Sequence, residues 1–525
     1  RQTFTEHTFA RAGRSDEQNI MAAGCGKVTG VNVSWGDIDV RYQQDIFPEL
    51  ELNEELQLSG WRGERVFAQA VVWTETPVMN LNFEVTDLKG ADRKVISSDN
   101  IRAGFVTYVA GDGYFSNGTG CGEWAKEPHR DSVVVADCID HHLERIQLDS
   151  MKTQGIWLTC WIPSDVEPGE YCGNLIVRDG RKVISKLHLK ITAQEEVLPQ
   201  PSDWHFHLDL WQNPYAAARY HDVELWSEEH FEVMRPLMTL LANAGQKVIT
   251  TTLIHKPWGG QTYDHFESMV KWIKKADGTW EYDFSIFDKW VEFMMECGVT
   301  AQINCYSIAP WSSRFQYYDE ASDSMLDFVA EVGTKEYEEY WSRMLSVFAR
   351  HLEEKGWFDI CAIAMDERPE EVMTEVIRVI RNVHPDFKIS LAGNYHPSIE
   401  KEIYDYCIAY GQEFPEDVLA RRKAEGKIST YYTCCTEIAP NLFTVSDPQD
   451  GLFLGMEMLR RKSDGYLRWA YNSWPEEPMT DSRFRAFTSG DTFIAYPLGR
   501  SSIRLERLVQ GIQEYEKVQV MKNKN

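Results

Sequence analysis

Two different patterns of apolar and polar positions divide the chain. From residue 1 to about residue 195, segments such as 65–73, 80–85 and 186–191 alternate apolar and polar residues, wholly or in part, with a period of two. Turn sequences such as Lys89-Gly90 and Glu167-Pro-Gly-Glu170 separate these segments. Short strands joined by short turns are typical of an antiparallel sandwich. We therefore predict an antiparallel β-sandwich domain over residues 1–195.

The pattern changes after residues 196–202, where two prolines in seven residues indicate a linker. Beyond it, apolar runs alternate with segments whose apolar residues have helical spacing, such as Phe287, Trp290, Val291 and Met294. The runs are 204–211, 247–254, 300–308, 360–366, 388–393, 406–411, 429–435 and 466–472. Eight strand–helix units predict a TIM-type (β/α)8 barrel over residues 203–525, with only a short helix, 399–404, between the fifth and sixth runs.

Composition narrows the class of partner. A net charge of -27 argues against binding to nucleic acid or to anionic membrane surfaces, and no apolar run approaches the length of a membrane span. The 11 cysteines include no pair with C-x-x-C spacing, so we predict no disulfide framework and no zinc site. Because the chain begins at Arg1, we expect a leader to have been removed and the protein to be secreted, periplasmic or at the cell surface.

Two adjacent carboxylates stand at the end of the fourth run. Asp366 and Glu367 come directly after its small and apolar residues 361–365, and a helical pattern opens behind Pro369. The carboxyl ends of parallel strands are where ligands bind. Two carboxylates there suit acid–base or oxocarbenium chemistry, because one can stay ionised while the other is protonated. The alternative is structural: Asp366 caps the next helix and Glu367 sits in its first turn.

Aromatic, amide and acidic residues lie at or after the ends of most of the other predicted strands, including Trp211 at the end of the first and Trp258 after the second. Together with 18 Trp and 23 Tyr in the chain, this ring favours a carbohydrate site around the two acids. The residues predicted to contact the substrate are Tyr395, Asn394, Tyr432, Trp469, Asn472, Trp474, Trp311, His207 and Asp209.

Three chemistries fit such a site. Metal-dependent hydrolysis is suggested by His205-x-His207-x-Asp209 on the first strand, although the later strands lack the further histidines that such barrels use. Retaining glycoside hydrolysis could use Glu437, after the seventh strand, as the nucleophile. The third is cleavage of a 2-acetamido sugar, in which the acetamido oxygen attacks the anomeric carbon. That route needs one carboxylate to hold the amide N–H and one acid to protonate the leaving oxygen. A carbohydrate-binding protein without catalysis is a further alternative.

The acid pair after an apolar strand, the segments 467–474 and 496–507, and Gly490-Asp491 resemble glycoside hydrolase family 123, and the likeness covers nearly the whole chain. The resemblance implies an exo-acting, retaining β-N-acetylgalactosaminidase that removes terminal β-GalNAc from a glycan or glycolipid through an oxazoline intermediate. On this resemblance Asp366 orients the amide and Glu367 is the acid/base. We expect neither a cofactor nor a metal in catalysis. A preference for GalNAc over GlcNAc rests on the resemblance alone.

Overall fold

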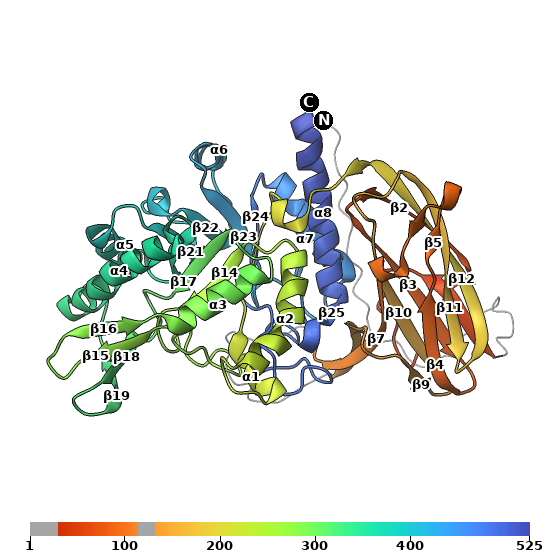
Figure 1. The fold of residues 1–525 in the computed structure, drawn as a ribbon, viewed down its shortest axis with the longest axis horizontal. Helices are drawn as coiled ribbons and strands as arrows, with labels where there is room; N and C mark the ends of the chain where they lie inside the picture. The colour runs from red at the N-terminus through yellow and green to blue at the C-terminus, as the bar shows by residue number, and fades with distance from the viewer. Residues whose placement is uncertain (1–29, 114–131, 525) are drawn as a thin grey trace, which may run out of the picture.

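The computed structural model describes residues 30–113 and 132–524, so the predictions for 1–29, 114–131 and 525 lie outside the described residues. The chain forms a β-rich amino-terminal part and a parallel barrel, and helix α8 (Ile503–Lys524) runs between them (Figure 1). Among the described helices, none is long and apolar enough to cross a bilayer.

The amino-terminal part consists of two facing sheets. The first has the order β1 (Val31–Gly36), β3 (Arg65–Thr74), β10 (Lys152–Trp161), β7 (Ile101–Gly111), β8 (Val133–Asp140), β25 (Ser501–Ser502). The second has the order β2 (Glu55–Arg62), β12 (Lys182–Val197), β11 (Gly169–Asp179), β4 (Val78–Val85), β9 (Ile146–Leu148), with β5 (Leu88–Lys89) and β6 (Val95–Ile96) beside β11. The described pairings are antiparallel as predicted, except that β2 and β12 run parallel.

Strand β3 explains why the two parts of the chain hold together. Its alternate residues Val66 and Ala68 enter the core between the sheets, where they join Leu175 and Leu189 of the second sheet. Phe67 points the other way and belongs to the same apolar cluster as the barrel core. Because both of its faces are covered, all ten residues of β3 are buried. Side chains of alternating direction thus serve two cores.

The barrel strands follow the order β13 (His207–Leu210), β24 (Gly465–Arg468), β23 (Ile428–Tyr432), β22 (Asp405–Ala409), β21 (Lys388–Gly393), β20 (Cys361–Met365), β17 (Gln302–Tyr306), β14 (Val248–Thr252). Each lies within or overlaps one predicted apolar run, and every pairing is parallel. The Lys247 amide donates to the Leu208 carbonyl at 2.9 Å, which links the two end strands and nearly closes the barrel.

Helices cover the barrel as α1 (Pro214–His221), α2 (Glu228–Asn243), α3 (Ser285–Glu296), α4 (Lys335–Lys355), α5 (Glu370–Val383), α6 (Glu416–Ala424) and α7 (Pro448–Arg460). Two features differ from prediction. The link from β21 to β22 holds a single 3-10 turn, Glu400–Glu402, in place of a helix. Two barrel loops also pair into a small sheet that the sequence did not predict, formed by β15 (Lys271–Lys274), β16 (Trp280–Asp283), β18 (Arg314–Asp319) and β19 (Ser324–Val329).

Helix α8 contacts α7 at the level of the backbone. A Cβ atom added to Gly455 of α7 would lie 2.3 Å from the carbonyl carbon of Gly511 in α8. Since real Cβ atoms do not approach so closely, only glycine fits this crossing.

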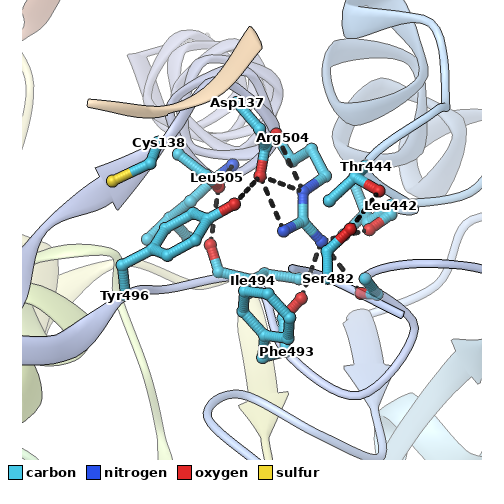
Figure 2. A network of polar contacts seen from close by, with 12 residues as sticks. Asp137, Cys138, Leu442, Thr444, Ser482, Phe493, Ile494, Tyr496, Arg504 and Leu505 are labelled. Atoms are coloured by element: carbon cyan, nitrogen blue, oxygen red, sulfur yellow. Dashed lines mark hydrogen bonds and ion pairs between the residues drawn. The ribbon is translucent and has the colours of Figure 1, made fainter. Parts of the chain in front are cut away.

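A buried ion pair joins the barrel to the first sheet (Figure 2). Arg504, at the start of α8, lies 2.8 Å from the carboxylate of Asp137 on β8, and both side chains are almost fully buried. Tyr496 donates its hydroxyl to the same carboxylate at 2.7 Å. Beside this pair, β25 adds an antiparallel edge to β8. The domain boundaries at 195 and 203 stay a prediction, and the described sheet continues to Val197.

Candidate active site

A cavity of about 500 Å³ opens at the carboxyl ends of the barrel strands, where the sequence predicted the site. It is lined by Trp211, Trp258, Gln261, Thr262, Phe266, Trp311, Asp366, Glu367, Ala392, Asn394, Ala409, Tyr432, Cys434, Cys435, Thr436, Leu467, Trp469 and Phe487. The small side chains Ala392 and Ala409 stand at or near the ends of their strands and leave room above the barrel core.

Asp366 is the more deeply placed of the two acids. The residue is 6% exposed, and burial together with the charge of Glu367 raises the pKa of its carboxyl to about 7. Among the described residues, no group makes a hydrogen bond of good geometry to its Oδ1 atom. The nearby Trp258 indole partly offsets the rise in pKa, because it favours the ionised form of Asp366. Helix α5 begins at Glu370 with Pro369 as its N-cap, so Asp366 does not cap this helix. The acid is therefore available to a ligand.

Glu367 is fixed by its neighbours. The Tyr432 hydroxyl, at the end of β23, donates a hydrogen bond to Glu367 Oε1. Burial and this carboxylate raise the pKa of Tyr432 well above its usual value, so the phenol stays protonated as a donor. On the other side, β21 packs against the Glu367 backbone at Gly393, where an added Cβ would lie at ordinary contact distance, 3.5 Å, from Glu367 Cα.

Stacked rings form one wall of the cavity. Trp211 and Trp258 have centroids 4.9 Å apart and an interplanar angle of 27°. Phe266 meets Trp258 edge-on at 4.8 Å, and Tyr306 packs 4.7 Å from Trp211. Rings that hold one another in this way offer a rigid apolar surface to a ligand.

A second part of the cavity wall, at the end of the neighbouring strand β24, depends on a buried ion pair. Trp469 packs on Phe487 at 5.2 Å, and its indole N–H donates to Asp491 Oδ1 at 3.3 Å. Arg468 donates to the same oxygen at 2.8 Å, and this arginine and Asp491 are fully buried. The Gly490-Asp491 segment therefore positions the Trp469 ring. Trp311, which is 45% exposed, stands at the rim.

Six of the predicted site residues line the cavity: Asp366, Glu367, Asn394, Tyr432, Trp469 and Trp311. Five others lie elsewhere: Tyr395, Asn472, Trp474, His207 and Asp209.

Three of those five pack into neighbouring structure. The Tyr395 ring lies against Phe414 at 5.5 Å. Asn472 is buried and donates its amide to the Asn213 carbonyl at 2.8 Å. Trp474 is fully buried, with its indole bonded to a backbone carbonyl at 2.7 Å. Each of these residues lies in a loop beyond the end of its strand, so the alternation of side chains along the strand does not determine where its side chain points.

The other two lie within the barrel beneath the cavity. His207 Nε2 is 3.6 Å from Asp405 Oδ2, and burial together with the charge of Asp405 raises the pKa of Asp209 to about 7. His205 precedes the strand and contacts Glu516 of α8 at 3.1 Å. The His-x-His-x-Asp pattern therefore does not converge on one site, contrary to what metal-dependent hydrolysis would need.

Loops supply the cavity residues that the sequence reasoning missed. They are Gln261, Thr262 and Phe266 after β14, Cys434, Cys435 and Thr436 after β23, and Phe487. Trp211 and Trp258 could be found from the sequence, since the first ends a predicted strand and the second follows one. The expectation of no disulfide framework needs one correction: Cys435 is disulfide-bonded, whereas its neighbour Cys434 and the other described cysteines are free.

Comparison with known proteins agrees with the fold. The family model of the glycoside hydrolase 123 catalytic domain matches residues 211–521, and that of the glycoside hydrolase 123 N-terminal domain matches residues 35–179. A family 123 glycoside hydrolase from Clostridium perfringens superposes with a TM-score of 0.85 at 29% identity, over 94% of this chain and 89% of that one.

More distant structures include a family 39 glycoside hydrolase from Bacteroides cellulosilyticus. It has 10% identity and a TM-score of 0.36 over 88% of this chain and 82% of that one, too low for any inference. No curated protein matches. Because the family model of the catalytic domain matches more than half of the residues of this chain, the chain belongs to glycoside hydrolase family 123.

Proposed function

We propose that this glycoside hydrolase is an exo-acting, retaining β-N-acetylgalactosaminidase in which the substrate's acetamido group is the nucleophile. The acetamido oxygen attacks the anomeric carbon while Glu367 protonates the departing glycosidic oxygen. An oxazoline forms and the bond to the leaving group breaks. Glu367 then takes a proton from water, which opens the oxazoline at the anomeric carbon and restores the original configuration.

The placement of Asp366 carries this proposal. Its Oδ1 is a buried acceptor without a bond of acceptable geometry among the described groups, and it lies next to the proposed acid. A substrate amide N–H would satisfy that acceptor and align the carbonyl oxygen. The negative charge of Asp366 would also offset the positive charge that develops on the oxazoline ring.

The raised pKa of Asp366 is compatible with this role at neutral and alkaline pH. With a pKa of about 7, the carboxyl is half ionised near neutrality in the free enzyme. If the ionised form is the active one, kcat/KM falls as pH drops below about 7, because kcat/KM reports the free enzyme.

The rival nucleophile, Glu437, has another partner. Its Oε2 accepts a hydrogen bond from the Cys434 amide at 2.9 Å, and it is not among the residues that line the cavity. Retaining enzymes that use their own nucleophile need its carboxylate about 5–5.5 Å from the acid, facing the sugar. This supports the acetamido route over attack by Glu437. The acid pair inside the cavity likewise supports catalysis over simple sugar binding.

We propose β-GalNAc-terminated glycans or glycolipids as substrates. The Clostridium perfringens relative was described for the hydrolysis of glycolipid glycans, which supports this class. The choice of GalNAc over GlcNAc rests on family resemblance. A secreted, periplasmic or cell-surface location is part of the proposal, and the disulfide at Cys435 is compatible with an oxidising compartment.

Paired nitrophenyl β-GalNAc and β-GlcNAc substrates test the sugar, and GalNAc-thiazoline, a mimic of the oxazoline, tests the route. We expect hydrolysis of the GalNAc substrate, inhibition of the wild type by the thiazoline, and weaker inhibition of Asp366→Asn. A covalent sugar adduct on Glu437 after treatment with a fluorinated glycoside, together with an inactive Glu437→Ala variant, would refute the acetamido route.

A further inference from the structure

A second cluster of chemically active side chains lies beside the sugar cavity. In the described part of the chain, one group of three residues has the spacing of metal ligands: His255, His265 and Glu267, whose ligand atoms all lie within 4.8 Å of one another. His255 Nδ1 contacts Glu267 Oε2 at 2.5 Å, and His265 Nε2 contacts Oε1 at 3.1 Å. Two imidazoles thus approach the two oxygens of one carboxylate.

Backbone contacts fix this arrangement. The Lys256 amide donates to the Phe266 carbonyl at 2.8 Å, so the segments that carry the two histidines run side by side. The Glu267 carbonyl accepts the hydroxyls of Thr252 at 2.5 Å and Tyr215 at 2.8 Å. The base of the loop is therefore anchored on both sides, and the ligand side chains start from held positions.

We propose that His255, His265 and Glu267 bind a divalent transition-metal ion, with Zn²⁺ as the best match. Two histidines and one carboxylate are a recurrent zinc ligand set that leaves a fourth position for water. Bonds of about 2.0–2.1 Å in a tetrahedral site place neighbouring ligand atoms about 3.3 Å apart. With one ligand atom taken from each residue, the three atoms already lie within 4.8 Å of one another, so each separation changes by at most about 1.5 Å to reach that value.

The surroundings admit an ion. The side chains of His255, His265 and Glu267 are 21%, 42% and 44% exposed, which gives an entry path from solvent. A cavity of about 250 Å³ borders His255 and Glu267, and Asp283 lies on its lining, so there is room for a water ligand. Metal binding replaces protons on the ring nitrogens, and the carboxylate supplies negative charge.

The ion would act on the loop rather than on the reaction. The chain between His255 and His265 carries Trp258, Gln261 and Thr262 into the wall of the sugar cavity. The three ligands themselves are not among the residues that line that cavity. Closing the loop at its base with a metal would hold the Trp258 wall in place. The inference does not depend on which sugar the enzyme cleaves.

The test uses the full-length, tag-free protein after removal of metal with a chelator. Titration with Zn²⁺ in a calorimeter should show one equivalent bound, and Co²⁺ should give the visible absorption of a tetrahedral site. His265→Gln removes the most accessible imidazole and should weaken Zn²⁺ binding roughly tenfold to a hundredfold or more. His384→Gln is the matched control, because His384 faces a single carboxylate, Glu353, at 4.0 Å. The control should bind as the wild type does.

Thermal stability gives a second measurement. Saturating Zn²⁺ should raise the Tm of the wild type and of His384→Gln by roughly 3 °C or more, and that of His265→Gln by much less. Each protein is compared with its own metal-free melting curve, and a cooperative metal-free transition shows that His265→Gln folds. If the wild type binds no Zn²⁺, or His265→Gln binds it as tightly as the wild type, the proposal is wrong and the cluster is a hydrogen-bonded His–Glu–His group only.

Discussion

Replacing Asp366 by Asn should make the protein more stable and less active, and the gain in stability should depend on pH. Burial and the charge of Glu367 raise the pKa of Asp366 from 3.8 to about 7 in the folded protein. The unfolded chain ionises this residue near its usual pKa. As pH rises from about 4 to 7, the wild type therefore loses stability that the neutral Asn variant keeps.

The size of the effect follows from the two pKa values of Asp366. A difference between 3.8 and about 7 corresponds to at most about 4 kcal/mol of unfolding free energy, fully lost above pH 7. Part of the rise in pKa comes from Glu367, and solvent reaches the cavity, so the effect is smaller than this limit. We expect Asp366→Asn to change the free energy of unfolding by about 2 kcal/mol more favourably at pH 8 than at pH 4. The same variant should lose about 3 kcal/mol of transition-state stabilisation, roughly a hundredfold in kcat.

Urea unfolding followed by circular dichroism, at several pH values from 4 to 8, measures the stability difference. Asp386→Asn, at an exposed turn, is the matched control, because it makes the same substitution without removing a buried carboxylate. Two results would refute this reasoning: a difference in unfolding free energy between Asp366→Asn and the wild type that is the same at pH 4 and at pH 8, or a variant that is less stable than the wild type at pH 8. Either would show that the buried Asp366 charge does not destabilise the folded protein. A variant with full activity would separately refute its role in the reaction.

Four further outcomes test other parts of the structure. Glu367→Gln should lose roughly a hundredfold or more on natural glycans and far less on activated aryl glycosides, since only poor leaving groups need the acid; equal losses in a kinetic assay would contradict this. Tyr432→Phe removes a hydrogen bond to a charged acceptor, so kcat/KM should drop by roughly tenfold or more, with the melting curve little changed. Gly455→Ala should destabilise the protein by about 1–3 kcal/mol, whereas Gly411→Ala, with open space around it, should change the urea midpoint little. Asp137→Asn should cost about 3–5 kcal/mol by leaving its buried arginine partner without a counter-charge, and a midpoint equal to the wild type would show that the pair contributes nothing.

The barrel could be predicted because its strands are buried on both faces. Parallel barrel strands contain mostly apolar residues, so each of the eight runs marked a strand, and the acids after the fourth run marked the cavity. The small sheet built from β15, β16, β18 and β19 left no such mark, since its strands of four to six residues are half exposed. The parallel pairing of β2 with β12 joins segments far apart in the sequence, which a local pattern cannot indicate.

The aromatic residues show where sequence reasoning about the site stops. Trp469 and Trp474 lie five positions apart in one segment, the first inside the last predicted apolar run and the second just after it. Trp469 lines the cavity, whereas Trp474 is fully buried and bonded to a backbone carbonyl. What separates them is the path of the loop after β24, which depends on partners such as Asp491. Composition and spacing identify the mouth of the barrel, but the tertiary contacts of the loops decide which ring faces the sugar.

The ion pair between Asp137 and Arg504 has a consequence for biosynthesis. The two residues are 367 positions apart, so a ribosome adding about 5–20 residues per second needs roughly 20–70 s to supply the arginine after the aspartate. During that interval the edge of β8 has no β25 beside it. If the sheet folds before α8 is made, the Asp137 carboxylate is removed from water before Arg504 is present to pair with it. An open strand edge is a template for pairing with other chains. Nascent chains that stall before α8 should therefore be the aggregation-prone and chaperone-dependent form of this enzyme.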